Sequence, residues 1–145
     1  MDLVKRLIPL TLLVSIAFAQ NLSLTIGNSV AGQNFAMKSA QFVFRINGCA
    51  DLSKAQVTAT AEGSVNGERR STPLRLFAGT GGVYSVGQQW GTDGKWVVGI
   101  TATCGSETTG AIVPVNGNGF VRESVQMLPH GPSKAEIESA LAAAH

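Results

Sequence analysis

The sequence predicts an all-β fold, an antiparallel β-sandwich of about seven strands followed by a short C-terminal α-helix. Two observations predict the strands: apolar and polar residues alternate in short segments along most of the chain, and glycine-rich turns divide these segments. Strands of this length and spacing are typical of a sandwich. A third observation predicts the helix, because only the last residues place their apolar side chains at helical spacing.

The N-terminal residues 1–19 have the features of an export signal. Lys5 and Arg6 precede an apolar, uncharged stretch of thirteen residues that ends in a small-x-small pattern at Ala19. A membrane-spanning helix needs about 20 apolar residues, and Gln20 ends this stretch earlier. We therefore expect cleavage after Ala19 rather than an uncleaved anchor, no later membrane insertion, and a periplasmic or secreted domain.

The first half of the domain predicts four strands, of which the last two form a hairpin. The Asn66-Gly67 pair is typical of a two-residue type I′ turn, in which both central residues need a positive φ. This turn opposes Val65 to Glu68, and the same register continued opposes Val57 to Leu76. The residues expected to face inward are Leu22, Leu24 and Ile26, then Ala40, Phe42, Phe44 and Ile46, then Val57, Ala59 and Ala61, then Leu74, Leu76 and Ala78.

The second half predicts another hairpin and a last strand. A three-residue loop over 92–94, with Gly94 in the left-handed region, opposes Trp90 to Trp96. We prefer this register to a two-residue loop, because slipping a strand by one residue reverses its faces. The expected inward residues are Tyr84, Val86 and Trp90, then Trp96, Val98, Ile100, Ala102 and Cys104, then Ala111, Val113 and Val115, with Pro114 suggesting an edge position.

Cys49 and Cys104 are the only cysteines. An even number of cysteines in an oxidising compartment predicts one intramolecular disulfide, although two separate thiols remain an alternative. A redox pair is disfavoured because the sequence has no Cys-x-x-Cys spacing. A bridge between these positions resembles the one that joins the two sheets of an immunoglobulin domain, so the sandwich is expected to be immunoglobulin-like.

The domain is expected to cover residues 20–128, and residues 129–145 form a linker and the C-terminal helix. Ser133 and Glu136 fit a capping box, in which each side chain accepts a backbone N–H of the other residue. The apolar residues that follow at helical spacing are Ile137, Ala140, Leu141 and Ala144. A helix this short is marginal alone, so it either docks on the sandwich or frays.

Charge and composition limit the function. Removal of residues 1–19 leaves nine basic and eight acidic side chains, and this balance gives no electrostatic reason to expect nucleic acid as a partner. No residues are predicted to be catalytic, because the two histidines lie in the linker and at the terminus, where no rigid scaffold orients a general base. We expect no cofactor, and a protein partner of unknown identity remains open.

Three residues could bind copper. Met127, His130 and Met37 offer thioether and imidazole ligands of the kind that copper accepts, and the first two lie close together in the sequence. The other interpretation, which we favour, is that Met127 packs beneath the tail and that His130 is solvated. Metal binding is therefore not expected.

The stretch from Leu74 to Cys104 contains an aromatic strand, a glycine turn and a tryptophan strand. The residues that form this pattern are Gly82-Val83-Tyr84, Trp90, Gly94-x-Trp96 and Val98-x-Ile100. In them the chain resembles the YtkA-like and FixH-type exported immunoglobulin-like domains. The resemblance implies a small sandwich outside the bacterial cytoplasm, and associates it with copper handling or with oxidase assembly. Our leading expectation is an exported, non-catalytic binding or interaction module, and a periplasmic copper-handling or oxidase-assembly accessory protein is the alternative.

Overall fold

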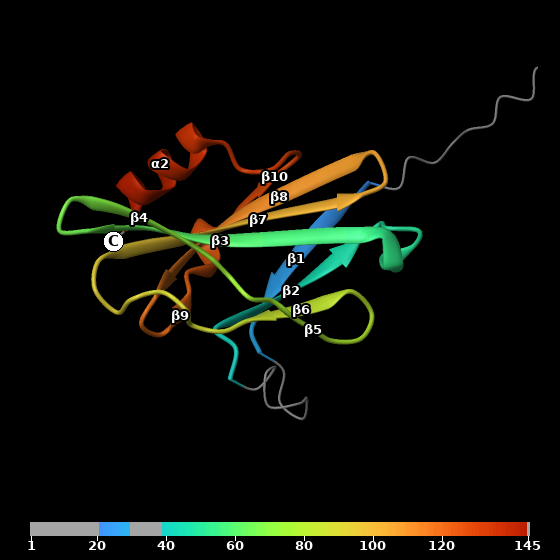
Figure 1. The fold of residues 1–145 in the computed structure, drawn as a ribbon, viewed down its shortest axis with the longest axis horizontal. Helices are drawn as coiled ribbons and strands as arrows, with labels where there is room; N and C mark the ends of the chain where they lie inside the picture. The colour runs from blue at the N-terminus through green and yellow to red at the C-terminus, as the bar shows by residue number, and fades with distance from the viewer. Residues whose placement is uncertain (1–20, 30–38, 145) are drawn as a thin grey trace, which may run out of the picture.

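A computed structural model describes residues 21–29 and 39–144 and contains two packed antiparallel sheets with one α-helix (Figure 1). The expected export signal, Met37 and His145 lie outside the described residues. The strands are β1 (Ser23–Gly27), β2 (Phe42–Asn47), β3 (Ala55–Val65), β4 (Glu68–Pro73), β5 (Phe77–Ala78), β6 (Val83–Val86), β7 (Lys95–Cys104), β8 (Glu107–Asn116), β9 (Gly119–Phe120) and β10 (Gln126–Leu128). Two 3₁₀ turns, η1 (Leu52–Lys54) and η2 (Arg122–Ser124), and helix α2 (Lys134–Ala143) complete the fold.

The strand order is that of an immunoglobulin-like sandwich. One sheet has the order β1-β2-β6-β5, and the other has the order β10-β8-β7-β3-β4, with β9 also paired to β8. These orders correspond to the A-B-E-D and G-F-C arrangement of immunoglobulin domains, with an added C′ strand. The predicted sandwich with a short C-terminal helix is confirmed. Its strand number was underestimated, because the strand expected to run from the Asn66-Gly67 turn to Ala78 is divided into β4 and β5, and because the chain after β8 returns along that strand as β9 and β10.

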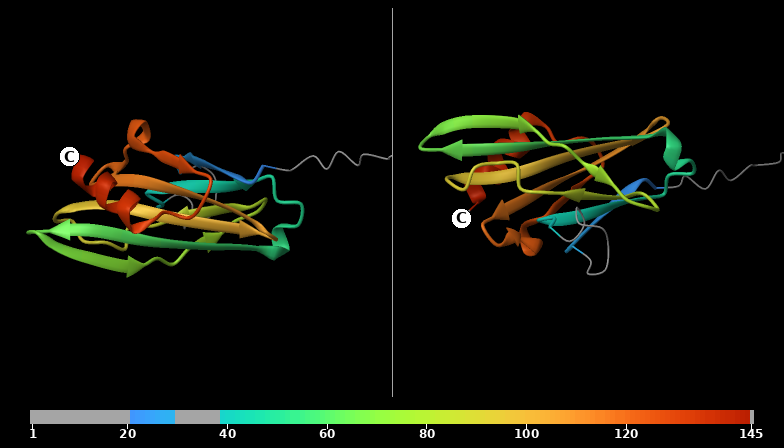
Figure 2. Two further views of the ribbon diagram at one scale, coloured as in Figure 1. Left: turned by 90° about the horizontal axis from the view of Figure 1, so that it is seen from above. Right: turned by 60° about the horizontal axis from the view of Figure 1, so that its bottom comes forward.

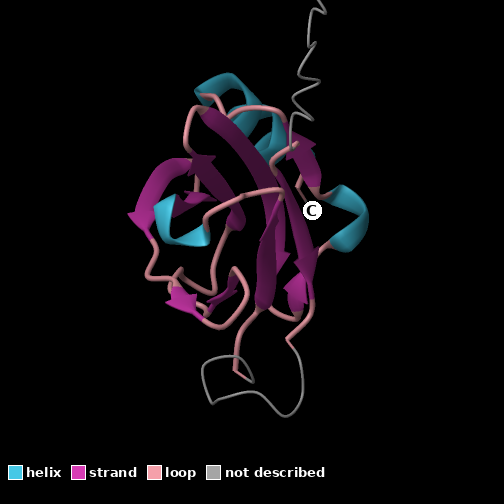
Figure 3. Cartoon of the chain, turned by 90° about the vertical axis from the view of Figure 1, so that its right-hand side faces the viewer, coloured by secondary structure: helices cyan, strands magenta, loops and turns pink. Residues whose placement is uncertain are grey.

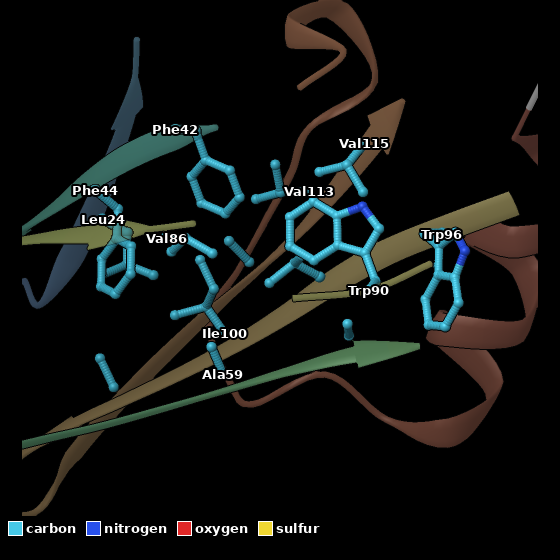
Figure 4. Close-up of a cluster of buried hydrophobic side chains, with 14 of the residues drawn as sticks. Leu24, Phe42, Phe44, Ala59, Val86, Trp90, Trp96, Ile100, Val113 and Val115 are labelled. Atoms are coloured by element: carbon cyan, nitrogen blue, oxygen red, sulfur yellow. The ribbon is translucent and has the colours of Figure 1, made fainter. Parts of the chain in front are cut away.

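The core lies between the two sheets, as the alternating patterns predicted. Figure 4 shows Phe42, Phe44 and Val86 of the four-stranded sheet facing Ala59 and Ile100 of the other sheet. Trp96 lies flat against β3 at a glycine, since a Cβ at Gly63 would be 2.5 Å from its ring. The buried residues of this core are Leu24, Phe42, Phe44, Ile46, Ala59, Ala61, Val86, Trp90, Trp96, Val98, Ile100, Ala102, Ala111, Val113 and Val115.

The first predicted hairpin is correct only near its turn. Asn66 and Gly67 both have a positive φ, and Val65 pairs with Glu68. The ladder ends where Thr60 pairs with Pro73, and one more hydrogen bond joins the Leu74 N–H to the Ala59 carbonyl. The chain then leaves for the other sheet and forms β5 there, so the expected pairing of Val57 with Leu76 is absent from the β3–β4 ladder.

The second predicted hairpin is wrong. β6 pairs with β2 and β5, whereas β7 pairs with β3 and β8, so Trp90 and Trp96 do not form a cross-strand pair. Residues 87–94 cross from one sheet to the other, and Trp90 lies in this crossing segment. Gly94 does have the predicted positive φ, at 87°, and a Cβ there would also clash with the Ser64 carbonyl of β3.

Helix α2 docks on the outer face of the six-stranded sheet (Figures 2 and 3). Its apolar residues Ile137, Ala140 and Leu141 are buried against Val97 of β7 and Ile112 of β8. These two strand residues point away from the main core, so both faces of the sheet are covered here. The linker before the helix crosses the sheet at Gly110, where a Cβ would clash with the His130 carbonyl.

The predicted capping box is present. Ser133 Oγ accepts the Glu136 N–H at 3.1 Å, and Glu136 Oε1 accepts the Ser133 N–H at 2.9 Å. These bonds hold the pKa of the Glu136 carboxyl below its ordinary value, with the Ser133 backbone N–H as the largest cause and the His130 ring as the next. Within the described ranges, no helix is both long and apolar enough to cross a membrane.

Candidate functional site

Cys49 and Cys104 form the predicted disulfide, with an S–S distance of 2.05 Å and a Cα–Cα distance of 5.8 Å. Cys49 follows β2 in one sheet, and Cys104 ends β7 in the other. The bridge therefore joins the two sheets at one end of the sandwich. Cys104 pairs with Ala55, the first residue of β3, so the bridge also fixes the start of that strand.

Two of the residues considered as copper ligands, Met127 and His130, lie in the described part of the chain, and both are exposed. Met127 lies on β10 and is 49% exposed rather than packed beneath the tail, which corrects that expectation. The His130 ring lies at the surface, and its Nε2 is 2.9 Å from Glu136 Oε1. The described residues contain no group of three or more His, Cys, Asp or Glu side chains that could hold a metal ion.

The most distinctive surface feature is an unpaired stretch of the β3 edge. β3 has eleven residues, and its Ala55–Ser64 stretch pairs with β7 on one side. On the other side β4 reaches only as far as Thr60, and Figure 2 shows it ending part of the way along β3. Among the residues that the structure describes, no strand therefore lies beside the residues before Ala59 on this side.

A groove follows this open edge, and we call it the edge groove. It is lined by Ala55 and residues 57–60 of β3, by Pro73, Leu74 and Leu76 of the chain that leaves the sheet, and by Tyr84 of β6. Its volume of about 640 Å³ lies in the usual range of ligand pockets. Its inner wall is apolar, because Val57, Leu74, Leu76 and Tyr84 also pack against the core.

The walls of the edge groove are held in place by the surrounding fold. The Tyr84 ring stacks on Phe44, with 5.3 Å between the ring centroids. The Gln89 side-chain amide accepts the Arg75 N–H at 2.8 Å and donates to the Arg75 carbonyl at 2.9 Å. The segment between β4 and β5 is thus bonded to Gln89 on the side away from the groove, as a strand would be bonded to its neighbour. Its other side faces the groove.

Two cations lie next to the edge groove. Lys54 immediately precedes Ala55, and Arg75 lies between Leu74 and Leu76; both are exposed. Neither makes an ion pair within the described residues, whereas Arg69 is bonded to Glu62 and Glu138. Asp51, the acidic residue near Lys54 in the sequence, accepts hydrogen bonds from the N–H and hydroxyl of Ser53. Lys54 and Arg75 are therefore cations without an ion-pair partner among the described residues, and Asp51 keeps its own negative charge because Ser53 is a neutral donor.

Sequence reasoning missed the edge groove because it extended the β3–β4 pairing past Leu74. The available signal was Pro73, which is typical of an edge strand and immediately precedes the point of departure. Comparisons of the chain with protein-family models, with curated proteins and with solved structures found no match. The resemblance of residues 74–104 to the YtkA-like and FixH-type domains stays a prediction.

Proposed function

We propose that this chain is an exported, non-catalytic interaction module that binds a protein partner in the edge groove. The observation that carries the proposal is the open stretch of β3 beside an apolar groove with rigid walls. A strand edge presents unpaired N–H and C=O groups, which natural proteins normally cover or protect with charges. An edge that is uncovered and also bordered by apolar side chains is suited to association with another chain.

Export is supported by the features of residues 1–19 and by the disulfide, since such bonds persist in oxidising compartments. The proposed location is the periplasm or the extracellular space. The copper-handling alternative draws no support from a specific observation, because Met127 and His130 face solvent and the His130 ring is bonded to Glu136.

Site-specific photo-crosslinking in the producing cell tests the proposal. A benzophenone side chain at Thr58 lies in the edge groove, and the same group at Thr108 of β8 is an exposed control position outside it. We expect the Thr58 position to crosslink to a defined protein that the Thr108 position does not capture. Absence of a specific product at Thr58, or identical products at both positions, would show that the groove is not the binding surface.

A further inference from the structure

We propose that the partner contributes an extended, acidic peptide segment, which adds to β3 as an extra strand in the edge groove. This inference rests on the proposed function and names the chemistry and the geometry of the partner. Three features support it: unpaired backbone groups along β3, apolar side chains on the groove wall, and cations at its border.

The backbone groups follow from the pairing register. Along an antiparallel strand, the N–H and C=O of successive residues point alternately to the two sides. The Ala59 carbonyl accepts the Leu74 N–H, so Ala59 faces the β4 side, and Val57 and Ala55 face the same way. The Ala55 N–H is bonded to the Leu52 carbonyl. No hydrogen bond within the described chain occupies the N–H or C=O of Val57, or the C=O of Ala55.

The opposite side of the groove also presents backbone groups that make no hydrogen bond within the described ranges. The Gly79 N–H bonds to the Val83 carbonyl, and the Arg75 backbone bonds to Gln89. By the same alternation, the Leu76 N–H and C=O point away from β6. No hydrogen bond within the described ranges occupies them. An inserted strand therefore finds the Val57 N–H and C=O and the Ala55 C=O on β3, and further backbone groups across the groove.

The side chains set the composition of the peptide. In an added strand, alternate residues point toward the sandwich and toward solvent. The inward residues would contact Leu74, Leu76 and Tyr84, which are half-buried and apolar, so aliphatic side chains fit there. The outward residues would lie near Lys54 and Arg75, so carboxylates fit there. The expected segment alternates aliphatic and acidic residues.

The outer edge of β4 and the open stretch of β3 differ in a way that supports this assignment. β4 has Glu68, Arg69 and Arg70 together with Pro73, and charges and proline are the usual protection of an edge against further pairing. The open stretch Ala55–Ala59 of β3 contains neither charge nor proline. Its pairing with β7 on the other side makes it a fixed template for a new strand.

The test uses a fluorescent eight-residue peptide that alternates glutamate and valine, titrated against the exported full chain by fluorescence anisotropy. A second peptide has lysine in place of glutamate. A third keeps the sequence but is N-methylated at the alternate residues whose N–H groups would bond to β3. We expect both altered peptides to bind at least about tenfold more weakly, because one reverses the charges and the other loses the backbone donors.

Variants of the chain provide the matched comparison. Val57→Pro removes the Val57 N–H that points toward the groove, and it leaves the hydrogen bonds between β3 and β7 in place. Ser71→Pro makes the same change on the outer edge of β4, away from the groove. Lys54→Gln and Arg75→Gln are each expected to weaken binding about two- to fivefold, as for exposed ion pairs, whereas Arg70→Gln is the charge control. Near-ultraviolet circular dichroism of the tryptophans verifies that each variant is folded.

The outcomes separate the two proposals. Loss of binding in Val57→Pro, its retention in Ser71→Pro, and discrimination against the N-methylated peptide would support strand addition. Equal binding of the three peptides would overturn it, while crosslinking at Thr58 would still support the proposed function. Sedimentation that shows a dimer, which Val57→Pro converts to a monomer, would identify a second copy of the chain as the occupant and would also overturn the inference.

Discussion

Removal of the disulfide is the perturbation whose effect can be worked most directly from the fold. The double variant Cys49→Ser/Cys104→Ser deletes the covalent link between the two sheets. A double variant is needed, because a single serine would leave one free thiol able to form intermolecular bonds. The nearest structural consequence is at Ala55, which pairs with Cys104 at the start of the β3 edge.

The magnitude follows from the length of the closed loop. The two cysteines are 55 residues apart, and a crosslink over this distance lowers the entropy of the unfolded chain by about 14 cal/mol/K. At 25 °C this corresponds to about 4 kcal/mol of stability. Because domains of this size are stable by roughly 5–15 kcal/mol, the variant is expected to lose a large part of its stability.

Urea unfolding followed by tryptophan fluorescence measures the loss. Trp96 and Cys104 lie at opposite ends of β7, about 27 Å apart at 3.4 Å per residue, so the probe does not report local changes at the mutated positions. Wild-type protein unfolded in reductant is the control and should match the variant. A loss below about 1 kcal/mol, or free labelling of both thiols in the unreduced wild type, would refute the reasoning.

Three further predictions concern the tail. Gly110→Ala should displace the linker and lower the free energy of unfolding by about 1–3 kcal/mol. Faster tryptic cleavage after Lys134 measures the displacement, and Gly27→Ala, where a Cβ meets nothing within 4 Å, is the control. Glu136→Gln should lower the melting temperature at neutral pH, because the folded state holds the pKa of Glu136 below its ordinary value. This stabilisation is complete above the ordinary glutamate pKa, so the difference between variant and wild type should shrink as the pH falls below that value and vanish below the lowered pKa of the folded state. Cu(I) titration should show no stoichiometric binding, and binding that His130→Ala abolishes would contradict the interaction-module proposal.

The faces of individual strands could be predicted from the sequence, because a two-residue period is a local property of the chain. The inward residues of β2 and β7 were identified correctly, and so were the Asn66-Gly67 turn and the capping box at Ser133. Each of these features depends on residues within a few positions of one another. The disulfide could also be predicted, since two cysteines in an oxidising compartment have a single possible pairing.

The partners of the strands could not be predicted in the same way. An inward face looks the same whether the next strand continues in the same sheet or crosses to the other one. Tyr84 and Ile100 face one core from different sheets, and their sequence pattern equally suits a hairpin. The crossing segment 87–94 contains glycines at 87, 91 and 94, which are compatible with a turn or with a crossover.

The same ambiguity explains why the candidate site was missed and why it exists. Leu74 and Leu76 keep the parity expected of a strand that pairs with β3, and they do point toward the core. Pro73 occupies an outward-facing edge position where its missing N–H costs nothing, and the chain leaves the sheet just after it. The core can accept these two leucines from either sheet, but β3 loses its neighbour when the chain departs. When the chain leaves the sheet in this way, the core is preserved but the edge of β3 is opened, and an open edge must be either used for binding or protected. The β3 stretch has neither the charges nor the proline that protect β4.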